Sequence, residues 1–216
     1  MTERFIKNEQ FNFICKQVGF IKDSVRQHIP PQVLASVYEL TNEKIMNCIP
    51  NMTAEQRDIV DFTNLKTTDE YDQAIVDLDA YRLPFPAITE QQLKKMFPKT
   101  KKLKLPDLSN IDLKKVTYLS WNDIRSNRKY VLYELDGTVA GIECSFSPST
   151  TTNTCSICHG QGAVTFFSTI TKEKKQNNPD YFRTIGNLIC ADSHECNQKI
   201  TDVTYLENLL RESLRK

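Results

Sequence analysis

The sequence predicts an α+β protein in which an N-terminal helical bundle, residues 1–98, precedes a C-terminal α/β domain, residues 99–216. The first reason is periodicity, because apolar residues recur every three or four positions in the first part and every two in the second. The second is charge: residues 1–98 hold 11 Lys/Arg against 14 Asp/Glu, a net of −3, whereas residues 99–216 hold 17 against 13, a net of +4. The third is length, since 216 residues suffice for two small domains.

The first 98 residues predict successive short helices, each with one apolar face. Pro30 and Pro50 mark helix ends, and the spacing of Thr53 and Gln56 predicts a capping box. Short helices need a packed apolar face to be stable, so we interpret these stripes as a bundle core and assign no chemistry to them. The stripes consist of Phe11, Ile14, Val18, Ile21 and Val25; Val33, Val37, Leu40 and Ile45; Ile59, Phe62 and Leu65; Tyr71, Ile75 and Leu78; and Leu93 and Met96.

The sequence pattern changes from helical to strand-like after the first 98 residues. Residues 98–108 carry four lysines within six positions and two prolines, which predicts an exposed connection or edge segment rather than a helix. Beyond it β-branched and aromatic residues dominate, and Asp136 followed by Gly137 favours a tight hairpin. A closing helix is expected over residues 202–214. The expected strands are 116–121, 129–135, 138–146, 163–170 and 181–189.

The seven cysteines are interpreted as reduced thiols. No run of about 18 apolar residues is present and the first residues are too charged for a secretory signal, so we expect a cytoplasmic protein without membrane association. Stable disulfides are disfavoured there, and an odd count would leave one thiol unpaired. Cys15, Cys48 and Cys144 stand alone in apolar surroundings and are expected to be buried structural thiols.

The other four cysteines form two close pairs with the spacing of metal ligands. Cys155 and Cys158 are separated by two residues, as in a tight turn that directs two thiolates at one ion. Cys190 and Cys196 are separated by five, which fits a strand end followed by the first turn of a helix. Four sulfur ligands favour Zn²⁺. The order of turn, hairpin, strand end and helix predicts a treble-clef-like zinc finger with one structural zinc.

The sequence carries no motif for catalysis. Phosphate-binding loops, the nucleophile elbow and catalytic zinc motifs are absent, and four cysteines would complete a zinc tetrahedron without an open position for a substrate. His28, beside two prolines, is interpreted as a surface or capping residue. Replacement of one sulfur by His159 or His194 is the alternative ligand set. We expect a binding protein without a small-molecule substrate, and a zinc enzyme is the weakest hypothesis.

Three stretches resemble one known family: "WNDIRSNRKYVLY" (121–133), "CSIC" (155–158) and "CADSHECNQKITDV" (190–203) are similar to the FusB/FusC-type fusidic acid resistance proteins, which bind elongation factor G. The resemblance covers nearly the whole chain. It implies a helical bundle followed by an α/β domain on a four-cysteine treble-clef finger. It also implies binding to the C-terminal domains of elongation factor G and release of the factor from drug-trapped ribosomes, without modification of the drug.

The family pattern is not matched at every position of the finger. Thr154, Leu188 and Leu206 stand where the resistance proteins present aromatic residues. Fewer exposed aromatic anchors would weaken a binding hot spot. The resemblance therefore implies binding to the factor more firmly than protection against the drug.

The basic C-terminal part is the expected partner surface, because a closed zinc site can only present a surface and a net of +4 would complement an acidic patch. We expect a monomer that binds elongation factor G directly and the ribosome indirectly. The alternative is a ribosome- or RNA-binding zinc finger that uses the lysines of residues 98–108, Arg125, Arg128, Lys129 and the loop 172–183. The candidate partner-binding residues are Arg128, Lys129, Lys172, Lys174, Lys175 and Phe182.

Overall fold

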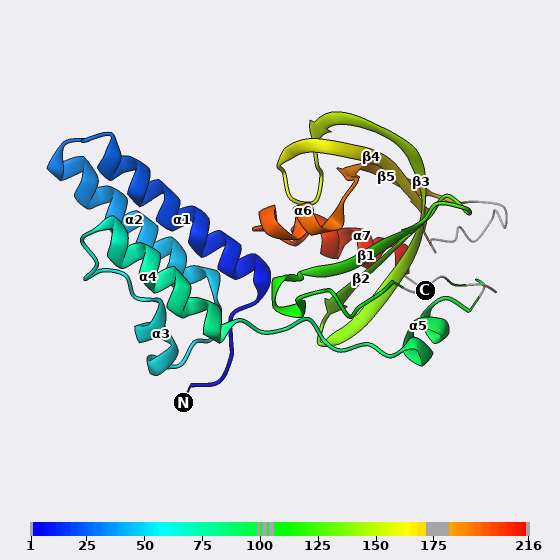
Figure 1. Cartoon of the computed structure of the whole chain (residues 1–216), viewed down its shortest axis with the longest axis horizontal. Helices are drawn as coiled ribbons and strands as arrows, with labels where there is room; N and C mark the ends of the chain where they lie inside the picture. Colours follow the sequence, from blue (N-terminus) through cyan, green and yellow to red (C-terminus); the bar gives the residue numbers. More distant parts are fainter. Residues whose placement is uncertain (1, 99, 101–102, 104–105, 172–181, 215–216) are drawn as a thin grey trace. The chain divides into compact units, whose positions relative to one another are not determined.

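The chain forms two compact units, Met1–Leu83 and Pro84–Lys216 (Figure 1). This division precedes the expected boundary at residue 98, because the segment 84–98 packs within the second unit. None of the described helices is long and apolar enough to cross a membrane. The computed structural model describes residues 2–98, 100, 103, 106–171 and 182–214.

The N-terminal unit is the predicted helical bundle. Its elements are α1 (Asn8–Arg26), α2 (Pro31–Cys48), α3 (Ala54–Val60), α4 (Thr68–Leu78) and the 3-10 turn η1 (Asp79–Tyr81). The long helices α1 and α2 form an antiparallel pair (Figure 1), and His28 is exposed in the loop between them with a φ of 51°. The capping box is confirmed, because Thr53 Oγ1 accepts a hydrogen bond from Gln56 N at 3.2 Å and Gln56 Oε1 accepts one from Thr53 N at 3.0 Å. Val33 and Leu40 of the second predicted stripe are exposed and lie outside the core. The stripes otherwise supply buried core residues, among them Ile14, Val18, Ile21, Ile45, Phe62, Tyr71 and Leu78.

The C-terminal unit is built on a five-stranded antiparallel sheet with the strand order β1-β2-β3-β4-β5. Strands that follow one another in the chain are therefore neighbours in the sheet (Figure 1). Asp136 and Gly137 form the tight turn between β2 and β3 with φ values of 51° and 74°, as their sequence predicts. The strands are β1 (Tyr118–Asp123), β2 (Arg128–Leu135), β3 (Thr138–Thr154), β4 (Gln161–Ile170) and β5 (Thr184–Cys190).

Strand β3 is longer than the sequence pattern predicts. The expected strand ended at residue 146, but β3 continues to Thr154. Its register with β4 is interrupted between Phe146 and Thr150, where Pro148 lies, and pairing resumes at Thr150 opposite Thr165. Proline is tolerated in a strand only at such irregular positions or at an edge. The extension carries the chain directly from the sheet into the first cysteine pair.

One face of the sheet is covered by the finger and two helices, α6 (Ser193–Lys199) and α7 (Thr204–Leu214). Because side chains alternate along a strand, every second residue of β1, β2 and β3 points to this face. The four clustered cysteines pack in the same apolar core. The buried sheet residues in this core include Tyr118, Val131, Tyr133, Ile142 and Cys144.

The opposite face of the sheet is covered by α5 (Glu90–Met96), the residues that flank it and the 3-10 turn η2 (Leu113–Lys115). The ring centroids of Phe97 and Tyr130 lie 4.9 Å apart. A Cβ atom at Gly141 would lie 2.8 Å from the Phe97 ring, so the bare glycine lets this ring reach the sheet. Helix α5 therefore belongs to the C-terminal unit and not to the bundle in which its apolar stripe placed it.

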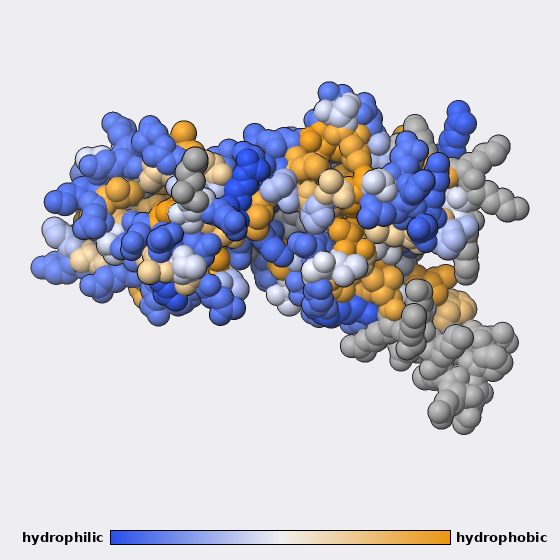
Figure 2. Space-filling view, turned by 90° about the horizontal axis from the view of Figure 1, so that it is seen from below, coloured by the Kyte–Doolittle hydropathy of each residue, from blue (hydrophilic) through white to orange (hydrophobic). Residues whose placement is uncertain are grey.

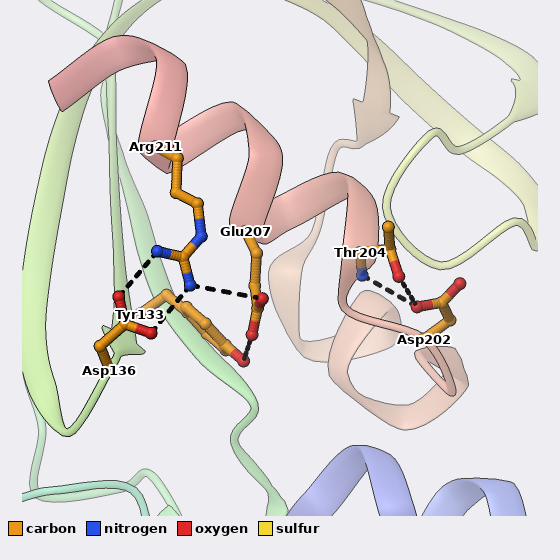
Figure 3. Close-up of polar contacts among 6 residues, drawn as sticks. All are labelled: Tyr133, Asp136, Asp202, Thr204, Glu207 and Arg211. Carbon is orange, nitrogen blue, oxygen red and sulfur yellow. Dashed lines mark hydrogen bonds and ion pairs between the residues drawn. The ribbon is translucent and has the colours of Figure 1, made fainter. Parts of the chain in front are cut away.

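Helix α7 is tied to the β2–β3 hairpin by polar contacts (Figure 3). Arg211 forms two hydrogen bonds with the Asp136 carboxylate, at 2.7 and 2.8 Å, and these bonds lower the pKa of Asp136. One turn earlier, Tyr133 Oη donates to Glu207 Oε1 at 3.0 Å. The contacts fix the helix that closes the core over the metal centre.

Candidate metal centre

The structure brings Cys155, Cys158, Cys190 and Cys196 together from three separate elements. Cys155 directly follows β3 and Cys158 lies in the turn after it, while Cys190 is the last residue of β5 and Cys196 belongs to α6. All four side chains are buried, and their Sγ atoms lie within 4.8 Å of one another. Residues up to 41 positions apart thus form one compact sulfur cluster.

The sulfur positions fit a tetrahedral zinc ion. Two Sγ–Sγ distances, Cys155 to Cys196 and Cys158 to Cys190, are 3.8 and 3.7 Å. A Zn–S bond of about 2.3 Å gives a tetrahedron edge of about 3.8 Å. The cluster therefore fits one structural zinc ion, and with four sulfur ligands it would leave no position open for a substrate.

The first cysteine pair lies in a tight backbone turn. Cys155 N donates to Gly160 O at 3.0 Å, and His159 N donates to Cys155 O at 2.9 Å. His159 takes a φ of 57°, which turns the chain back toward β4. The amides of Ile157 and Cys190 lie 3.4 and 3.3 Å from Cys155 Sγ, so this sulfur receives backbone donors from both sides of the finger. Such donors stabilise a thiolate.

Helix α6, which carries the fourth cysteine, is fixed at its first turn. Asp192 Oδ1 accepts a hydrogen bond from His194 N at 2.8 Å and caps the helix. Ser193 Oγ donates to Ser120 O at 3.1 Å, and Asn197 bonds the backbone of the same strand, β1. Cys196 is thus positioned by contacts on both sides of it in the chain.

The four thiols perturb one another strongly. Hydrogen bonds from Cys158, Cys190 and Cys196 lower the pKa of Cys155. The pKa of Cys196 is raised, first of all by its hydrogen bond with Cys155. Thiols this close cannot all ionise without a cation among them, so they share protons as one group. A divalent metal would displace these protons, because the thiolate is the ligand form.

The two histidines considered as alternative ligands lie outside the cluster. His159 and His194 are exposed, and no histidine joins the four cysteines among the described residues. The ring of His194 instead contacts the amide nitrogen of Gln198 at 3.0 Å. The geometry thus favours the four-cysteine set.

The three remaining cysteines have the character expected of structural thiols. Cys144 is buried, and Cys15 and Cys48 are partly buried. Burial raises the pKa of Cys15 and Cys48 to about 11 and that of Cys144 to about 12. At neutral pH they are protonated and poor nucleophiles.

The candidate partner-binding residues have different positions. Arg128 is partly exposed, with its Nε 3.3 Å from Glu143 Oε1, and Phe182 is 67% exposed. Lys129 corrects the expectation, because it is only 1% exposed and cannot present its charge to a partner. Arg128 and Lys129 are consecutive residues of β2, and consecutive strand residues point to opposite faces of the sheet. The side chain of Lys129 therefore points into the core. Lys172, Lys174 and Lys175 lie outside the described residues.

Sequence reasoning missed three residues around the cluster: Tyr118, Lys129 and Asn197. The alternation of strand residues was the available signal, since it places Lys129 on the same face as Val131. It was overridden by the general expectation that lysine is exposed. For Asn197 no local signal existed, because its partners Thr117 and Tyr118 lie about eighty positions away in the chain.

A helical bundle followed by a sheet with a closed four-cysteine centre defines a two-part protein with a structural zinc finger. Residues 95–212 match the family of the FBP C-terminal treble-clef zinc-finger, and residues 5–86 match the elongation factor G-binding protein, N-terminal, family. The chain belongs to this family of elongation factor G-binding zinc-finger proteins. The matched families describe a binding protein and a zinc finger rather than an enzyme.

The chain is similar over almost its whole length to the solved structure of a fusidic acid resistance protein. The fusidic acid resistance protein FusC is 27% identical, with a TM-score of 0.80 over 97% of this chain and 98% of that chain. No curated protein sequence matches. The family resemblance drawn from the residues around the finger is therefore confirmed.

Proposed function

We propose that this protein binds elongation factor G through its C-terminal unit and promotes release of the factor from the ribosome, which would confer tolerance to fusidic acid. Family membership along both parts of the chain carries the proposal. The similarity to a fusidic acid resistance protein supports the link to the drug. The closed zinc centre adds a physical reason, since it can stabilise a binding surface but offers no open position for chemistry.

Release requires only differential affinity. A protein that binds the free or distorted factor more tightly than the ribosome-locked factor shifts the equilibrium toward release. No covalent step and no nucleotide are needed. We place this action in the cytoplasm, where translation proceeds, and propose that a monomer suffices.

Two exposed apolar side chains of β4 and a half-buried neighbour on β5 are our candidate contact surface. Phe166 and Ile170 are 50% and 64% exposed on the outer face of β4, and Leu188 lies opposite Phe166 on β5. The Phe166 ring covers Gly186, since a Cβ atom there would lie 2.7 Å from it. A large ring held in place at low entropic cost is the kind of residue that forms a hot spot.

The distribution of charge also supports binding through the C-terminal unit. Residues 84–216 hold 19 Lys/Arg against 14 Asp/Glu, a net of +5, whereas residues 1–83 hold 9 against 13, a net of −4. Figure 2 shows apolar patches between the hydrophilic side chains of the C-terminal unit, in the right half of the view. A basic surface with apolar patches would be steered to an acidic protein face and then held by apolar contact.

Calorimetry with purified elongation factor G tests the proposal. We expect one binding event whose affinity falls with salt, and Phe166→Ala to weaken it about tenfold or more. Phe20→Ala is the matched control, because Phe20 is equally exposed at 50% but lies in α1. Absence of a complex at about 50 μM together with a clear shift of RNA would overturn the proposal in favour of RNA binding.

The release step needs its own experiment. Ribosomes stalled with elongation factor G and fusidic acid should lose the factor faster when the protein is added. Phe166→Ala should slow this release in proportion to its loss of affinity. If the protein binds the factor without accelerating its release, the proposed binding stands and the proposed release from the ribosome is wrong.

A further inference from the structure

Lys129 is a buried cation on the metal side of the sheet. In the strand register it lies opposite Asn122 of β1 and Cys144 of β3, and cross-strand partners share a face. Cys144 belongs to the apolar core that contains the four clustered cysteines. The ammonium group of Lys129 is therefore enclosed on the face that holds the zinc centre.

The contacts of Lys129 within the protein do not neutralise its charge. Its Nζ donates to Asn122 Oδ1 at 3.1 Å, and it forms no ion pair with a carboxylate of the described residues. Burial lowers its pKa, while Cys144, Cys196, Asp192 and Cys190 act in the opposite direction. A buried ammonium without an ion-pair partner is strongly unfavourable. A nearby anion would offset this cost.

Tyr118 presents a second polar group to the same cluster. Its side chain is fully buried, and its hydroxyl has no hydrogen-bond partner among the described residues. Its pKa is raised well above the usual range, first by burial and then by the thiol of Cys196. A buried hydroxyl normally has an acceptor. Tyr118 and Cys196 belong to the same buried core, so a thiolate of the metal cluster is the acceptor available to this hydroxyl.

The zinc-loaded cluster would supply a negative charge for Lys129 and a hydrogen-bond acceptor for Tyr118. One Zn²⁺ and four thiolates carry a formal net charge of roughly −2 in a buried site. Such a site is stabilised by nearby cations and by hydrogen-bond donors to its sulfur atoms. Lys129 provides a cation and Tyr118 provides a hydrogen-bond donor, and the two residues lie on adjacent strands of the sheet.

We propose that the Lys129 ammonium offsets the negative charge of the zinc centre and that the Tyr118 hydroxyl donates a hydrogen bond to the Cys196 thiolate. Both are positioning residues rather than ligands. The face of the β1–β2 pair is thereby part of the metal site, and not only an apolar support for it. In the metal-free protein the buried ammonium and hydroxyl groups destabilise the fold. Their effect on the free energy of unfolding therefore depends on zinc occupancy.

Substitution of Co²⁺ for zinc in the full-length protein gives the decisive readout. Removing a donor or a cation makes the thiolates more electron-rich, so the sulfur-to-cobalt charge-transfer band should move to longer wavelength in Tyr118→Phe and Lys129→Met. Apparent zinc affinity, measured by competition with a coloured chelator, should fall about tenfold or more. Affinity also falls when a variant merely destabilises the fold, and the band position separates the two causes.

Two variants serve as matched controls. Tyr133→Phe removes a buried hydroxyl that bonds Glu207 rather than a cysteine, and Arg128→Met makes the same change of charge at the adjacent, exposed position. Both should leave the band unchanged. An unchanged band in Tyr118→Phe, which alters a single oxygen atom, would overturn the hydrogen bond even if Lys129→Met fails to fold. A band that is also unchanged in folded Lys129→Met would overturn the charge role.

Discussion

Asn197 pairs with the backbone of Tyr118 as a neighbouring strand would. Its Oδ1 accepts from Tyr118 N at 3.1 Å and its Nδ2 donates to Tyr118 O at 3.0 Å. The same Oδ1 accepts from Thr117 N at 2.8 Å, and the side chain is 5% exposed. One side chain therefore satisfies three buried backbone groups at the start of β1 and immediately before it.

Asn197→Ala should destabilise the C-terminal unit by about 3 kcal/mol, because it leaves two buried amides without an acceptor and each costs about 1–3 kcal/mol. Urea unfolding of the zinc-loaded protein measures this difference. Gln198→Ala, at the exposed neighbouring position, should change the midpoint little. Equal stabilities of the two variants would mean that water replaces the side chain.

Cys155→Ser should abolish zinc binding while the helical unit stays folded. The protein is expected to hold about one zinc per chain, since folding of the finger and metal binding are coupled. Metal analysis together with circular dichroism measures both effects. Cys48→Ser makes the same change away from the cluster and should retain the metal. Less than about half an equivalent of zinc in the unaltered protein would contradict the assignment.

A chain that begins at Pro84 should fold with zinc, whereas one that begins at residue 99 should be less stable by about 5 kcal/mol. The shorter chain lacks Phe85, Leu93 and Phe97, which are buried on the sheet, and each such side chain contributes about 1.5–3 kcal/mol. Unfolding of both chains checks the boundary. We expect the longer one to keep its affinity for elongation factor G, and loss of binding despite correct folding would place the helical unit in the interface.

Cys15 and Cys48 predict a loss of stability at alkaline pH. Burial raises the pKa of both thiols from 9.0 to about 11. Above pH 9 the unfolded chain releases these protons while the folded chain keeps them, so the stability they contribute is full below pH 9 and is lost as pH rises toward 11. Unfolding at about pH 8 and about pH 10 should show the decrease, and replacing both cysteines by alanine should reduce it. An equal decrease in this double variant would assign the effect to other groups.

The helices and the zinc ligands could be predicted because their signals are local. Capping residues such as Thr53 and Gln56 are three positions apart, and each cysteine pair lies within one turn or one strand–helix junction. The partner of an apolar stripe is not a local property. The pattern of α5 gives an apolar face around Leu93, but only tertiary packing decides that this face meets Tyr130.

Two further features depended on context. The sequence pattern predicted a strand that ends at residue 146, yet an irregular register lets β3 continue past Pro148. The charge of Lys129 indicated exposure, yet the alternation of β2 places it in the core. In both cases the local preference was the weaker effect. Pairing with β4 extends β3, and the buried anionic site accommodates the charge of Lys129.

Cys196 and Asn197 are adjacent in α6, and together they connect this helix to both outer strands of the sheet. Cys196 connects the helix through the cluster to the end of β5, and Asn197 bonds the backbone of β1. Unpaired outer strands are templates for pairing with another chain. Removal of zinc would free the helix from β5 and weaken its hold on β1, so a metal-depleted protein would self-associate through its sheet before it lost its helical unit. The zinc ion would thus act as a guard against aggregation as well as a support for the binding surface.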